Sequence, residues 1–473
     1  MSGTAQTPSV NDLKVALVTP VADLYHRLWP DIDAALQGLA VRVACALQEE
    51  EGLKVFCYAP VSTVMQVSAL FEALKGDEID LVIVALAPYC PSGVLLPALQ
   101  ETRLPLLLWP MQEMFELKPD LYDSETIKLN HGVHGVQDLA QVLAHQGRFF
   151  GVIHGHVQQA DFRQAIHAWA RAGRMRRAMQ EARPLQVGAY FEDMLDLKIG
   201  ETVLAGDMGV APTPVSLDTF TECLTAVKEE ALHDRVAQYR AQFDIAPEVD
   251  ATLLARTARG DLALQGLMEQ YGSRACGVNF LTLCNDARIG DALHVAASCL
   301  MNEGYGYAAE GDWVTAVLLW GMQQGFGCAS FSEMFSVDYA HHRILLKHWG
   351  EGNIRMARRR PRMIRSTFTD RQSAAFAVAD FEFAPGAALL VNLTAHPEGK
   401  GHLICVRGSM TADALPQVEG PRALFKPNVE DVCDLLTDYA YAGGTHHLAL
   451  IVNPQPHVLE KLCILSGWMH TSL

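Results

Sequence analysis

The acidic and imidazole side chains that could bind a metal ion are concentrated in two stretches of the chain. Glu310 lies in the Gly-rich segment Gly304–Trp313, and Glu333 and His348 follow within 39 positions, while Gly443–His447 ends in a pair of histidines. Carboxylates and imidazoles together form a mixed oxygen and nitrogen ligand set that suits Mn²⁺, Co²⁺ or Zn²⁺. With open coordination positions, such an ion could take adjacent oxygens of a sugar and polarise them. We therefore consider a metal-dependent enzyme acting on a sugar.

Each acidic residue also has a plainer structural explanation. Glu310 and Asp312 stand in a turn that leads into an apolar helix, so Asp312 could simply cap that helix while Glu310 is solvated. Glu333 is harder to explain in this way, because it lies between Phe331 and Met334, and an acid in apolar surroundings needs a partner. Taken one at a time, these residues support the metal hypothesis only weakly.

Other motifs narrow the choice of enzyme class. The sequence contains no H-E-x-x-H, G-x-S-x-G or P-loop motif, so zincin, α/β-hydrolase and P-loop NTPase activities lack support. The run Arg355–Arg365 holds six arginines in eleven positions. It most simply pairs with acidic surface of the same or a neighbouring subunit, and the alternative is that it holds an anionic substrate, since guanidinium groups match carboxylate and phosphate geometry.

The composition indicates which partners the protein lacks and which cellular compartment it occupies. The chain of 473 residues carries 37 basic and 54 acidic residues, and a net charge of −17 argues against nucleic-acid binding. Its eleven cysteines form no C-x-x-C pair, which indicates free thiols in a reducing cytosol. No apolar signal core starts the chain, and no apolar run reaches the roughly 18 residues of a membrane span. We expect a cytoplasmic protein with no membrane partner.

The elements that must position these residues are predicted from periodicity. In the first third, short apolar runs alternate with helix-length segments at 31–48 and 61–74, which indicates a Rossmann-like, doubly wound parallel sheet covered on both faces. A long basic helix is expected at 158–182. The expected strands are residues 14–19, 54–58, 79–85, 105–109 and 149–153.

The rest of the chain predicts two further domains, giving an α/β protein with boundaries 1–182, 183–328 and 329–473. The central α/β domain has expected strands at 185–190 and 276–283 and expected helices at 216–231, 250–271 and 289–302. The last domain reads as mostly antiparallel β-structure, because β-rich patterns alternate with Pro and Gly turns. Its expected strands lie in 374–383, 388–393 and 402–407.

Taken in order, these pieces resemble the L-arabinose isomerase family, within the wider arabinose/fucose isomerase group. The most specific segments are Gly304–Trp313 and Ala442–His447, supported by Ser330–Glu333, His348 and Leu129–Gly135. The resemblance covers most of the chain. It implies a three-domain fold and a metal-dependent aldose–ketose isomerase, usually loaded with Mn²⁺, that moves a proton between C1 and C2 of a sugar through an enediol.

The resemblance also implies roles for particular residues. The metal ligands map onto Glu310, Glu333, His348 and His447, with His446 as the alternative to His447. Glu310 and Glu333 would also carry protons, assisted by Asp312. The positions that match the family's sugar pocket are Tyr25, His131, His134, Met194, Phe280, Arg343 and His446.

Members of the family form trimers or hexamers in which the N-terminal domain of one subunit closes its neighbour's site. We therefore expect a homo-oligomer with shared active sites, with His134 acting in trans.

Three departures from the family pattern concern the substrate. Ala22 and His131 stand where the family has glutamines, and Arg343 falls where a pocket residue is aliphatic. A site that loses a polar contact loses discrimination for the hydroxyl which that contact recognised. We expect L-arabinose to be a poor substrate compared with another aldose. The alternatives are an isomerase of a different, anionic sugar, and a relative that binds a sugar without catalysis.

Overall fold

The protein is described by a computed structural model that covers residues 12–368 and 374–473. Its internal contacts divide the chain into two compact units. The N-terminal unit contains the described residues up to Arg177 together with Pro456–Gly467, and the larger unit contains Ala178–Gln455 and Trp468–Leu473. In the described part of the chain, no helix combines the length and the apolar composition that crossing a membrane requires.

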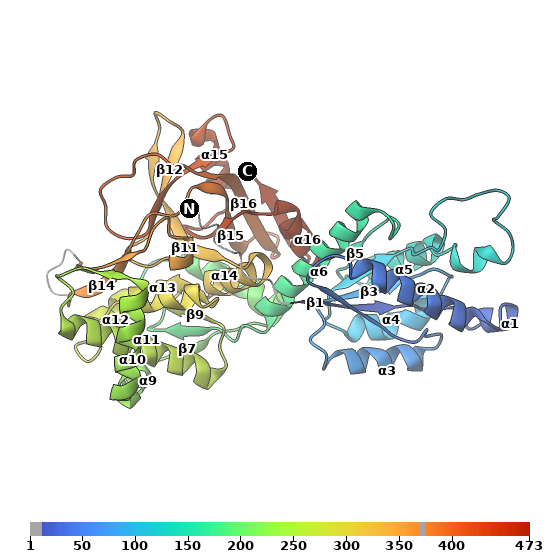
Figure 1. Ribbon diagram of the computed structural model, residues 1–473, viewed down its shortest axis with the longest axis horizontal. Coiled ribbons are helices and arrows are strands. Elements are labelled where there is room, and N and C mark those ends of the chain that lie inside the picture. The colour runs from blue at the N-terminus through green and yellow to red at the C-terminus, as the bar shows by residue number, and fades with distance from the viewer. Residues whose placement is uncertain (1–11, 369–373) are drawn as a thin grey trace. The chain divides into compact units, whose positions relative to one another are not determined.

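The N-terminal unit is built on a parallel sheet of strand order β2-β1-β3-β4-β5. The sheet carries helices on both faces: α3, α4 and α5 share one apolar core on one face, and Figure 1 shows α2 on the side opposite to α3. The doubly wound parallel sheet expected from the apolar runs is confirmed. The strands are β1 (Leu13–Val18), β2 (Leu53–Cys57), β3 (Leu81–Ala85), β4 (Leu106–Trp109) and β5 (Gly151–Val152), and the helices are α1 (Tyr25–Leu28), α2 (Ile32–Leu47), α3 (Val64–Leu74), α4 (Ser92–Glu101), α5 (Val133–His145) and α16 (Pro456–Ser466).

The basic helix α6 (Ala160–Gln180) uses its arginines internally. Asp80, the residue that precedes β3 in the chain, is fully buried. Arg174 donates to both of its carboxylate oxygens, at 2.6 and 2.8 Å. Arg177 adds two more hydrogen bonds to the same carboxylate, at 2.9 and 3.1 Å. A buried carboxylate needs such partners, so these charges fasten the helix to the sheet.

The larger unit contains a second parallel sheet of order β10-β9-β6-β7. The expected bounds of four elements in this region were wrong, and the first of them, the strand expected at 185–190, ends at Val187. The strand expected at 276–283 ends at Val278, because Asn279 accepts a hydrogen bond from the Thr282 amide and caps a helix. The helix expected at 216–231 is broken at Val227 and Lys228, whose backbone is extended.

The helix expected at 289–302 begins only at His294, after Leu293 in the left-handed region (φ 60°). The strands of this part are β6 (Leu185–Val187), β7 (Thr213–Val215), β9 (Ala275–Val278) and β10 (Gly306–Ala309), and the helices are α7 (Asp196–Ile199), α8 (Glu201–Val203), α9 (Leu217–Ala226), α10 (Glu229–Gln242), α11 (Ala251–Tyr271), α12 (Phe280–Asn285), α13 (His294–Asn302) and α14 (Trp313–Phe326).

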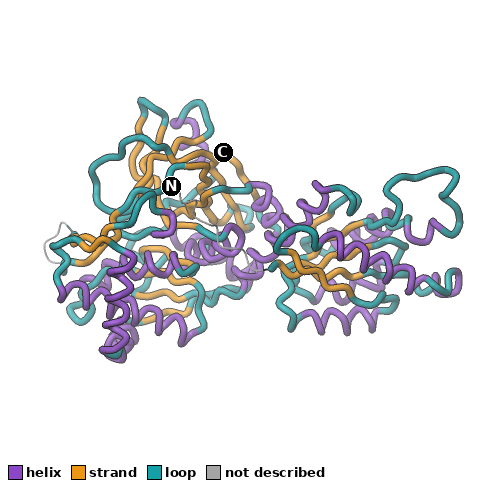
Figure 2. Tube along the Cα trace, viewed as in Figure 1, coloured by secondary structure: helices purple, strands orange, loops and turns teal. Residues whose placement is uncertain are grey.

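The end of the chain forms a six-stranded antiparallel barrel. Its strand order is β15-β18-β11-β12-β17-β16, and the pairing of β15 with β16 closes it. Figure 2 shows these strands gathered near the C-terminus. The β-rich last part is therefore confirmed, but the sequence pattern had not indicated strands in 329–347. The strands are β11 (Ala329–Asp338), β12 (Arg343–Lys347), β15 (Gly386–Ala395), β16 (Gly401–Met410), β17 (Arg422–Pro427), β18 (His447–Val452) and β19 (Met469–Ser472), with helix α15 (Val432–Tyr441).

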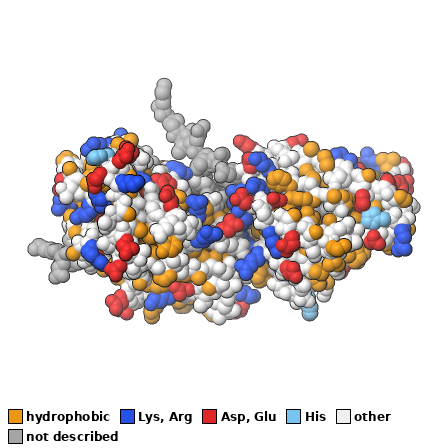
Figure 3. All heavy atoms as spheres, turned by 90° about the horizontal axis from the view of Figure 1, so that it is seen from below, with side chains coloured by type: hydrophobic (Ala, Val, Ile, Leu, Met, Phe, Trp, Pro, Cys, Tyr) orange, Lys and Arg blue, Asp and Glu red, His pale blue; other side chains and the backbone are white. Residues whose placement is uncertain are grey.

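A small sheet of order β14-β13-β8 contains the end of the arginine run, with β8 at Asp244–Ile245, β13 at Arg362–Ser366 and β14 at Phe376–Asp380. The arginines pair with acids of their own unit, for example Arg358 with Glu382 at 3.4 Å and Arg360 with Asp244 at 3.1 Å. Acidic and basic side chains are interspersed over the face that Figure 3 displays. The run thus follows the simpler of its two interpretations.

Candidate metal centre

Glu310 projects from a strained turn between β10 and α14. Its backbone lies in the left-handed region (φ 61°), which is unusual for a residue other than glycine. Gly311 follows at φ 77°, and a Cβ atom there would lie 2.1 Å from the Ala189 carbonyl oxygen. The Phe191 amide donates to the Glu310 carbonyl at 2.9 Å. The turn is therefore held from outside, in a conformation that a side chain at position 311 would not permit.

Asp312 caps a helix with one carboxylate oxygen and contacts a histidine with the other. Its Oδ1 accepts from the Thr315 amide at 3.0 Å and caps α14. Its Oδ2 lies 2.8 Å from Nδ1 of His447. The capping explanation and a role at the site are both compatible with these contacts, since each uses a different oxygen.

The barrel brings Glu333 and two histidines side by side on three adjacent strands, with Glu333 in the middle of β11. Glu333 on β11 pairs across one side with His447, the first residue of β18, and across the other side with Lys347, the last residue of β12. His348 follows directly. The ring of Phe331 packs edge-on against both imidazoles, at centroid distances of 5.1 Å from His348 and 4.8 Å from His447. The antiparallel register thus determines the grouping.

The side-chain ligand atoms converge. Nε2 of His447 lies 3.3 Å from a carboxylate oxygen of Glu310 and 3.3 Å from one of Glu333. Nε2 of His348 lies 3.4 Å from Glu333 and 4.0 Å from Glu310. Nε2 of His446 lies 3.3 Å from Glu310. Atoms that share one cation at about 2.1 Å are themselves separated by roughly 3–4 Å, so the spacing suits a shared divalent ion.

Glu310, Glu333, His446 and His447 form a group that could hold a metal, with ligand atoms all within 4.8 Å of one another. His348, expected as a ligand, contacts the same two carboxylates. The candidate ligands of the site are therefore two glutamates and three histidines.

Each of these imidazoles is held from behind by a different carboxylate. Nδ1 of His447 bonds Asp312 at 2.8 Å, as described above. Nδ1 of His348 lies 2.7 Å from Glu351, and Nδ1 of His446 lies 2.6 Å from Asp196. A carboxylate behind a histidine fixes its tautomer and leaves the Nε2 lone pair available for a metal.

The carboxylates of the cluster create a negative environment that favours a positive charge near the Nε2 atoms of the histidines. Burial lowers the pKa of His348 and His447, but the neighbouring carboxylates outweigh it and the pKa of both is raised. Burial raises the pKa of Glu310, but the neighbouring imidazoles of His446 and His447 bring it to about 2. Nε2 of His447 is buried without a hydrogen bond of good geometry in the described part of the chain. These residues fit a cation as their common partner.

Exposure separates the three histidines. The side chain of His447 is 0% exposed and that of His348 is 2% exposed, whereas that of His446 is 36% exposed. His446 is therefore the one that solvent or a ligand can reach.

Phe280 and Met194, like His446 and Arg343, are expected pocket residues that lie in the same unit as this cluster. The ring of Phe280 lies 5.8 Å from that of His348 and 6.1 Å from that of Phe191. Met194 is partly buried and stands two residues before Asp196, the first residue of α7.

The expected pocket residues Tyr25, His131 and His134 lie in the N-terminal unit, where they form one aromatic group. His131 and His134 are stacked at 5.7 Å, and His134 stacks on Tyr89 at 4.8 Å. Nδ1 of His131 faces the Ile127 carbonyl oxygen, so Nε2 is the acceptor. It lies 3.0 Å from the Tyr25 hydroxyl and 3.3 Å from the Tyr89 amide.

Two of the departures from the family pattern are thus engaged in internal contacts. His131 uses both of its nitrogens locally, and burial lowers its pKa. Arg343 binds Asp338 at 3.0 Å and Asp413 at 2.6 Å, at the end of the β11–β12 hairpin opposite to Glu333. These contacts provide no support for an anionic sugar.

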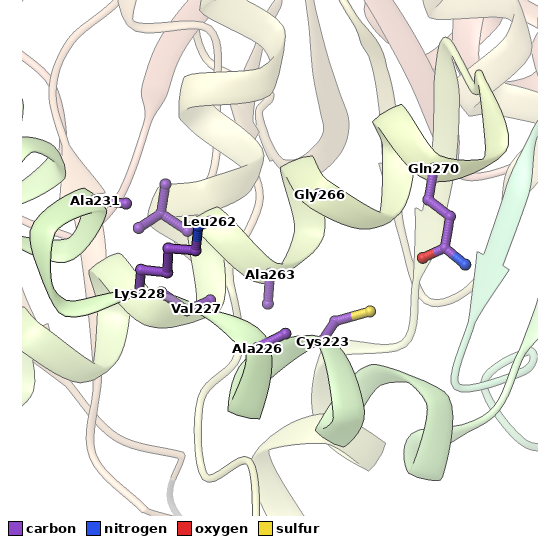
Figure 4. Close-up of a pocket in the computed structure, with 9 residues that line it drawn as sticks. All are labelled: Cys223, Ala226, Val227, Lys228, Ala231, Leu262, Ala263, Gly266 and Gln270. Atoms are coloured by element: carbon purple, nitrogen blue, oxygen red, sulfur yellow. The ribbon is translucent and has the colours of Figure 1, made fainter.

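A separate groove of about 350 Å³ lies among α9, α10 and α11 (Figure 4). Its lining is mostly apolar and includes no residue of the metal-ligand group. It is lined by Cys223, Ala226, Val227, Lys228, Ala231, Leu262, Ala263, Gly266 and Gln270.

No sequence pattern identified the carboxylates that bond Nδ1 of His446 and His348. Asp196 is 250 positions from His446 and stands in no motif. Glu351 follows His348 at a spacing of three, which could have marked it, but a single acid near a histidine is too common to be informative. His294, which contacts the same Glu351 carboxylate, stands in an apolar helix pattern that does not mark it as functional.

Comparison with known proteins covers nearly the whole chain. The models of the L-arabinose isomerase N-terminal, central and C-terminal domains match residues 11–181, 200–325 and 328–468. The L-arabinose isomerase of Nocardioides sp. (strain ATCC BAA-499 / JS614) is 25% identical over 475 residues, covering 97% of this chain and 93% of that protein. That of Thermotoga sp. (strain RQ2) is 26% identical over 400 residues, covering 81% and 78%.

A third relative, the L-arabinose isomerase of Shouchella clausii (strain KSM-K16), is 23% identical over 437 residues, covering 88% of this chain and 85% of its own. Among solved structures, a periplasmic solute-binding protein from Actinobacillus succinogenes 130z with bound D-allose covers 66% of this chain and 90% of its own, at 13% identity and a TM-score of 0.17. That score is too low to support a conclusion about fold or ligand.

Proposed function

The chain belongs to the L-arabinose isomerase family, and from this premise we propose that it is a divalent-metal-dependent aldose–ketose isomerase. The observation that carries the proposal is the convergence of Glu310, Glu333 and three imidazole Nε2 atoms, with a carboxylate behind each imidazole.

We assign Glu310, Glu333, His348 and His447 as the ligands and His446 as the residue that faces the sugar. Burial supports this division, because the two assigned histidines are almost fully enclosed and His446 is not. Mn²⁺ is the ion that we propose, with Co²⁺ or Zn²⁺ as alternatives, since a mixed carboxylate and imidazole set accepts all three.

The reaction requires a proton to leave one carbon and return to its neighbour. A bound divalent cation would supply Lewis-acid polarisation of adjacent sugar oxygens. Glu310 and Glu333 are the proton carriers in our proposal, since they present carboxylate oxygens within 4.8 Å of each other. Asp312 holds the ring of His447, and Phe280 offers an apolar wall beside His348. His446, whose side chain is 36% exposed and whose Nε2 lies 3.3 Å from Glu310, is the imidazole that we propose bonds a sugar hydroxyl.

We propose a neutral aldose as the substrate. The relatives above are named L-arabinose isomerase, and the two side chains that could have attracted an anionic sugar, His131 and Arg343, are engaged in other contacts. Ala22 is buried and offers no side-chain hydrogen bond. The expectation that another aldose ranks above L-arabinose therefore stays a prediction that rests mainly on Ala22.

The test is a panel of aldoses and ketoses, charged members included, assayed after EDTA treatment and again after adding Mn²⁺. We expect no turnover without metal and isomerisation of at least one neutral aldose with it. Glu310→Gln and Glu333→Gln should each abolish turnover while circular dichroism stays unchanged. Near wild-type rates in both variants would refute the proton-carrier roles. An L-arabinose kcat/KM clearly above all others would refute the altered preference alone.

A further inference from the structure

A buried carboxylate joins two histidines behind the proposed metal site. Glu351 lies just beyond β12, and its side chain is 0% exposed. One of its oxygens lies 2.7 Å from Nδ1 of His348, and the other lies 2.9 Å from Nδ1 of His294 and 2.9 Å from the Gly350 amide. The Tyr307 hydroxyl approaches the first oxygen at 3.5 Å. Glu351 thus receives donors on both oxygens without contact with solvent.

His294 is unexpected at its position. It begins α13 with 0% of its side chain exposed, among the rings of Phe280, Phe368 and Phe376, at 5.2, 6.5 and 5.3 Å. Neither Nδ1 nor Nε2 makes a hydrogen bond of good geometry among the residues that the structure describes, and the nearest partner of Nδ1 is the Glu351 oxygen at 2.9 Å. An imidazole in an apolar setting needs a compensating contact, and the contact of hydrogen-bonding length that it has is Glu351.

Glu351 differs from the carboxylates that bond Nδ1 of His447 and His446. Asp312 also caps a helix, and Asp196 is partly exposed on a short helix. Glu351 has no capping contact and lies deepest, so a merely structural role would be filled better by an apolar residue, which removes the cost of burying a charge. Retaining a buried carboxylate beside a metal-facing histidine indicates a role toward that histidine.

We infer that Glu351 is a positioning residue that sets the metal affinity of His348, and that His294 acts on the metal only by holding Glu351. The inference rests on the proposed metal site. Glu351 fixes the Nδ1–H tautomer of His348 and aims Nε2 at Glu310 and Glu333. His294 in turn orients the second oxygen of Glu351, so that the carboxylate cannot rotate away.

The experiment measures Mn²⁺ binding by calorimetry in the whole protein, and the visible absorption spectrum of the Co²⁺-loaded protein, with no sugar present. Glu351→Gln should weaken Mn²⁺ binding by about 10–100-fold and change the Co²⁺ spectrum. His294→Phe should weaken binding less. In the Glu351→Gln background, adding His294→Phe should cause no further loss. The matched control is His402→Gln, which alters another buried histidine of the barrel that bonds Thr471 at 2.8 Å, and it should leave both readouts unchanged.

The outcomes separate the two proposals. If the wild-type protein binds neither ion, the metal site and this inference both fall. If the wild type binds Mn²⁺ and Glu351→Gln binds equally well, the inference alone falls. Independent, multiplying losses for the two substitutions would overturn the role of His294. Should Glu351→Gln fail to fold, the double variant Glu351→Leu/His294→Phe leaves no unpaired buried charge and should show the same loss of affinity.

Discussion

At the scale of single residues, the site illustrates that a histidine's second nitrogen is as informative as its first. His348, His446 and His447 all direct Nε2 at a glutamate, and a buried or partly buried carboxylate holds Nδ1 of each. What distinguishes them is burial. A metal ligand benefits from exclusion of water, whereas a group that bonds substrate must be reachable.

From this difference we predict separable effects of two substitutions. His348→Gln should weaken Mn²⁺ binding by about tenfold or more, because it removes a ligand. His446→Gln should leave Mn²⁺ affinity within about threefold and instead lower kcat/KM, because it removes a contact with the sugar. Calorimetry with Mn²⁺ and steady-state kinetics check this. The reverse pattern would make His446 the ligand in place of His348.

At the scale of elements, the turn between β10 and α14 is the part of the site whose backbone conformation is most restricted. Glu310 and Gly311 both have positive φ, and the loop at Ala189 packs directly on Gly311. Gln186 donates to the Gly311 carbonyl at 3.0 Å, and the Phe191 amide bonds Glu310. The strain in the turn is thus offset by contacts from the neighbouring strand and loop.

Gly311→Ala should therefore lower the free energy of unfolding by roughly 3 kcal/mol or more and weaken metal binding, since about 1–2 kcal/mol comes from the left-handed conformation alone and the clash adds to it. Gly399→Ala is the matched control: Gly399 has φ 79°, close to the 77° of Gly311, but its Cβ would meet nothing within 4 Å. It should cost only about 1 kcal/mol. Urea unfolding measures both, and equal losses would show that the Ala189 contact contributes nothing.

At the scale of the whole molecule, the residues expected to bind sugar are divided between the two compact units. Tyr25, His131 and His134 belong to the N-terminal unit, and the metal-ligand group belongs to the larger one. The family resemblance predicts that a site is completed by the N-terminal domain of a neighbouring subunit. Complementation between two inactive variants can test this.

Co-expression of His134→Ala and Glu333→Gln proteins should restore activity to roughly a quarter of the wild-type level. In a mixed cyclic assembly, about one site in four would receive an intact half from each subunit. Each variant expressed alone is the control and should be nearly inactive. Sedimentation that shows a fully active monomer, or no recovery in verified mixed oligomers, would contradict a shared site.

How much of this could be predicted from sequence differs between the fold and the site. The parallel sheet of the N-terminal unit was predicted because its strands, such as Leu81–Ala85, are continuous apolar runs, and such runs are a local signal. Glu310, Glu333, His348 and His447 were singled out because a metal site needs these residue types and because the flanking motifs resemble a known family. Where they meet in space depends on the pairing of β11 with β12 and β18, which no local pattern indicated.

What the sequence determined by itself was therefore the class of fold, the ligand types and the hypothesis of a sugar isomerase. Only the tertiary structure revealed Asp196 behind His446, and Glu351 between His348 and His294. The physical reason is that these contacts join residues up to 250 positions apart. A buried carboxylate is chosen by the partners that compensate its charge, and those partners are brought to it by the packing of strands and helices rather than by their spacing along the chain.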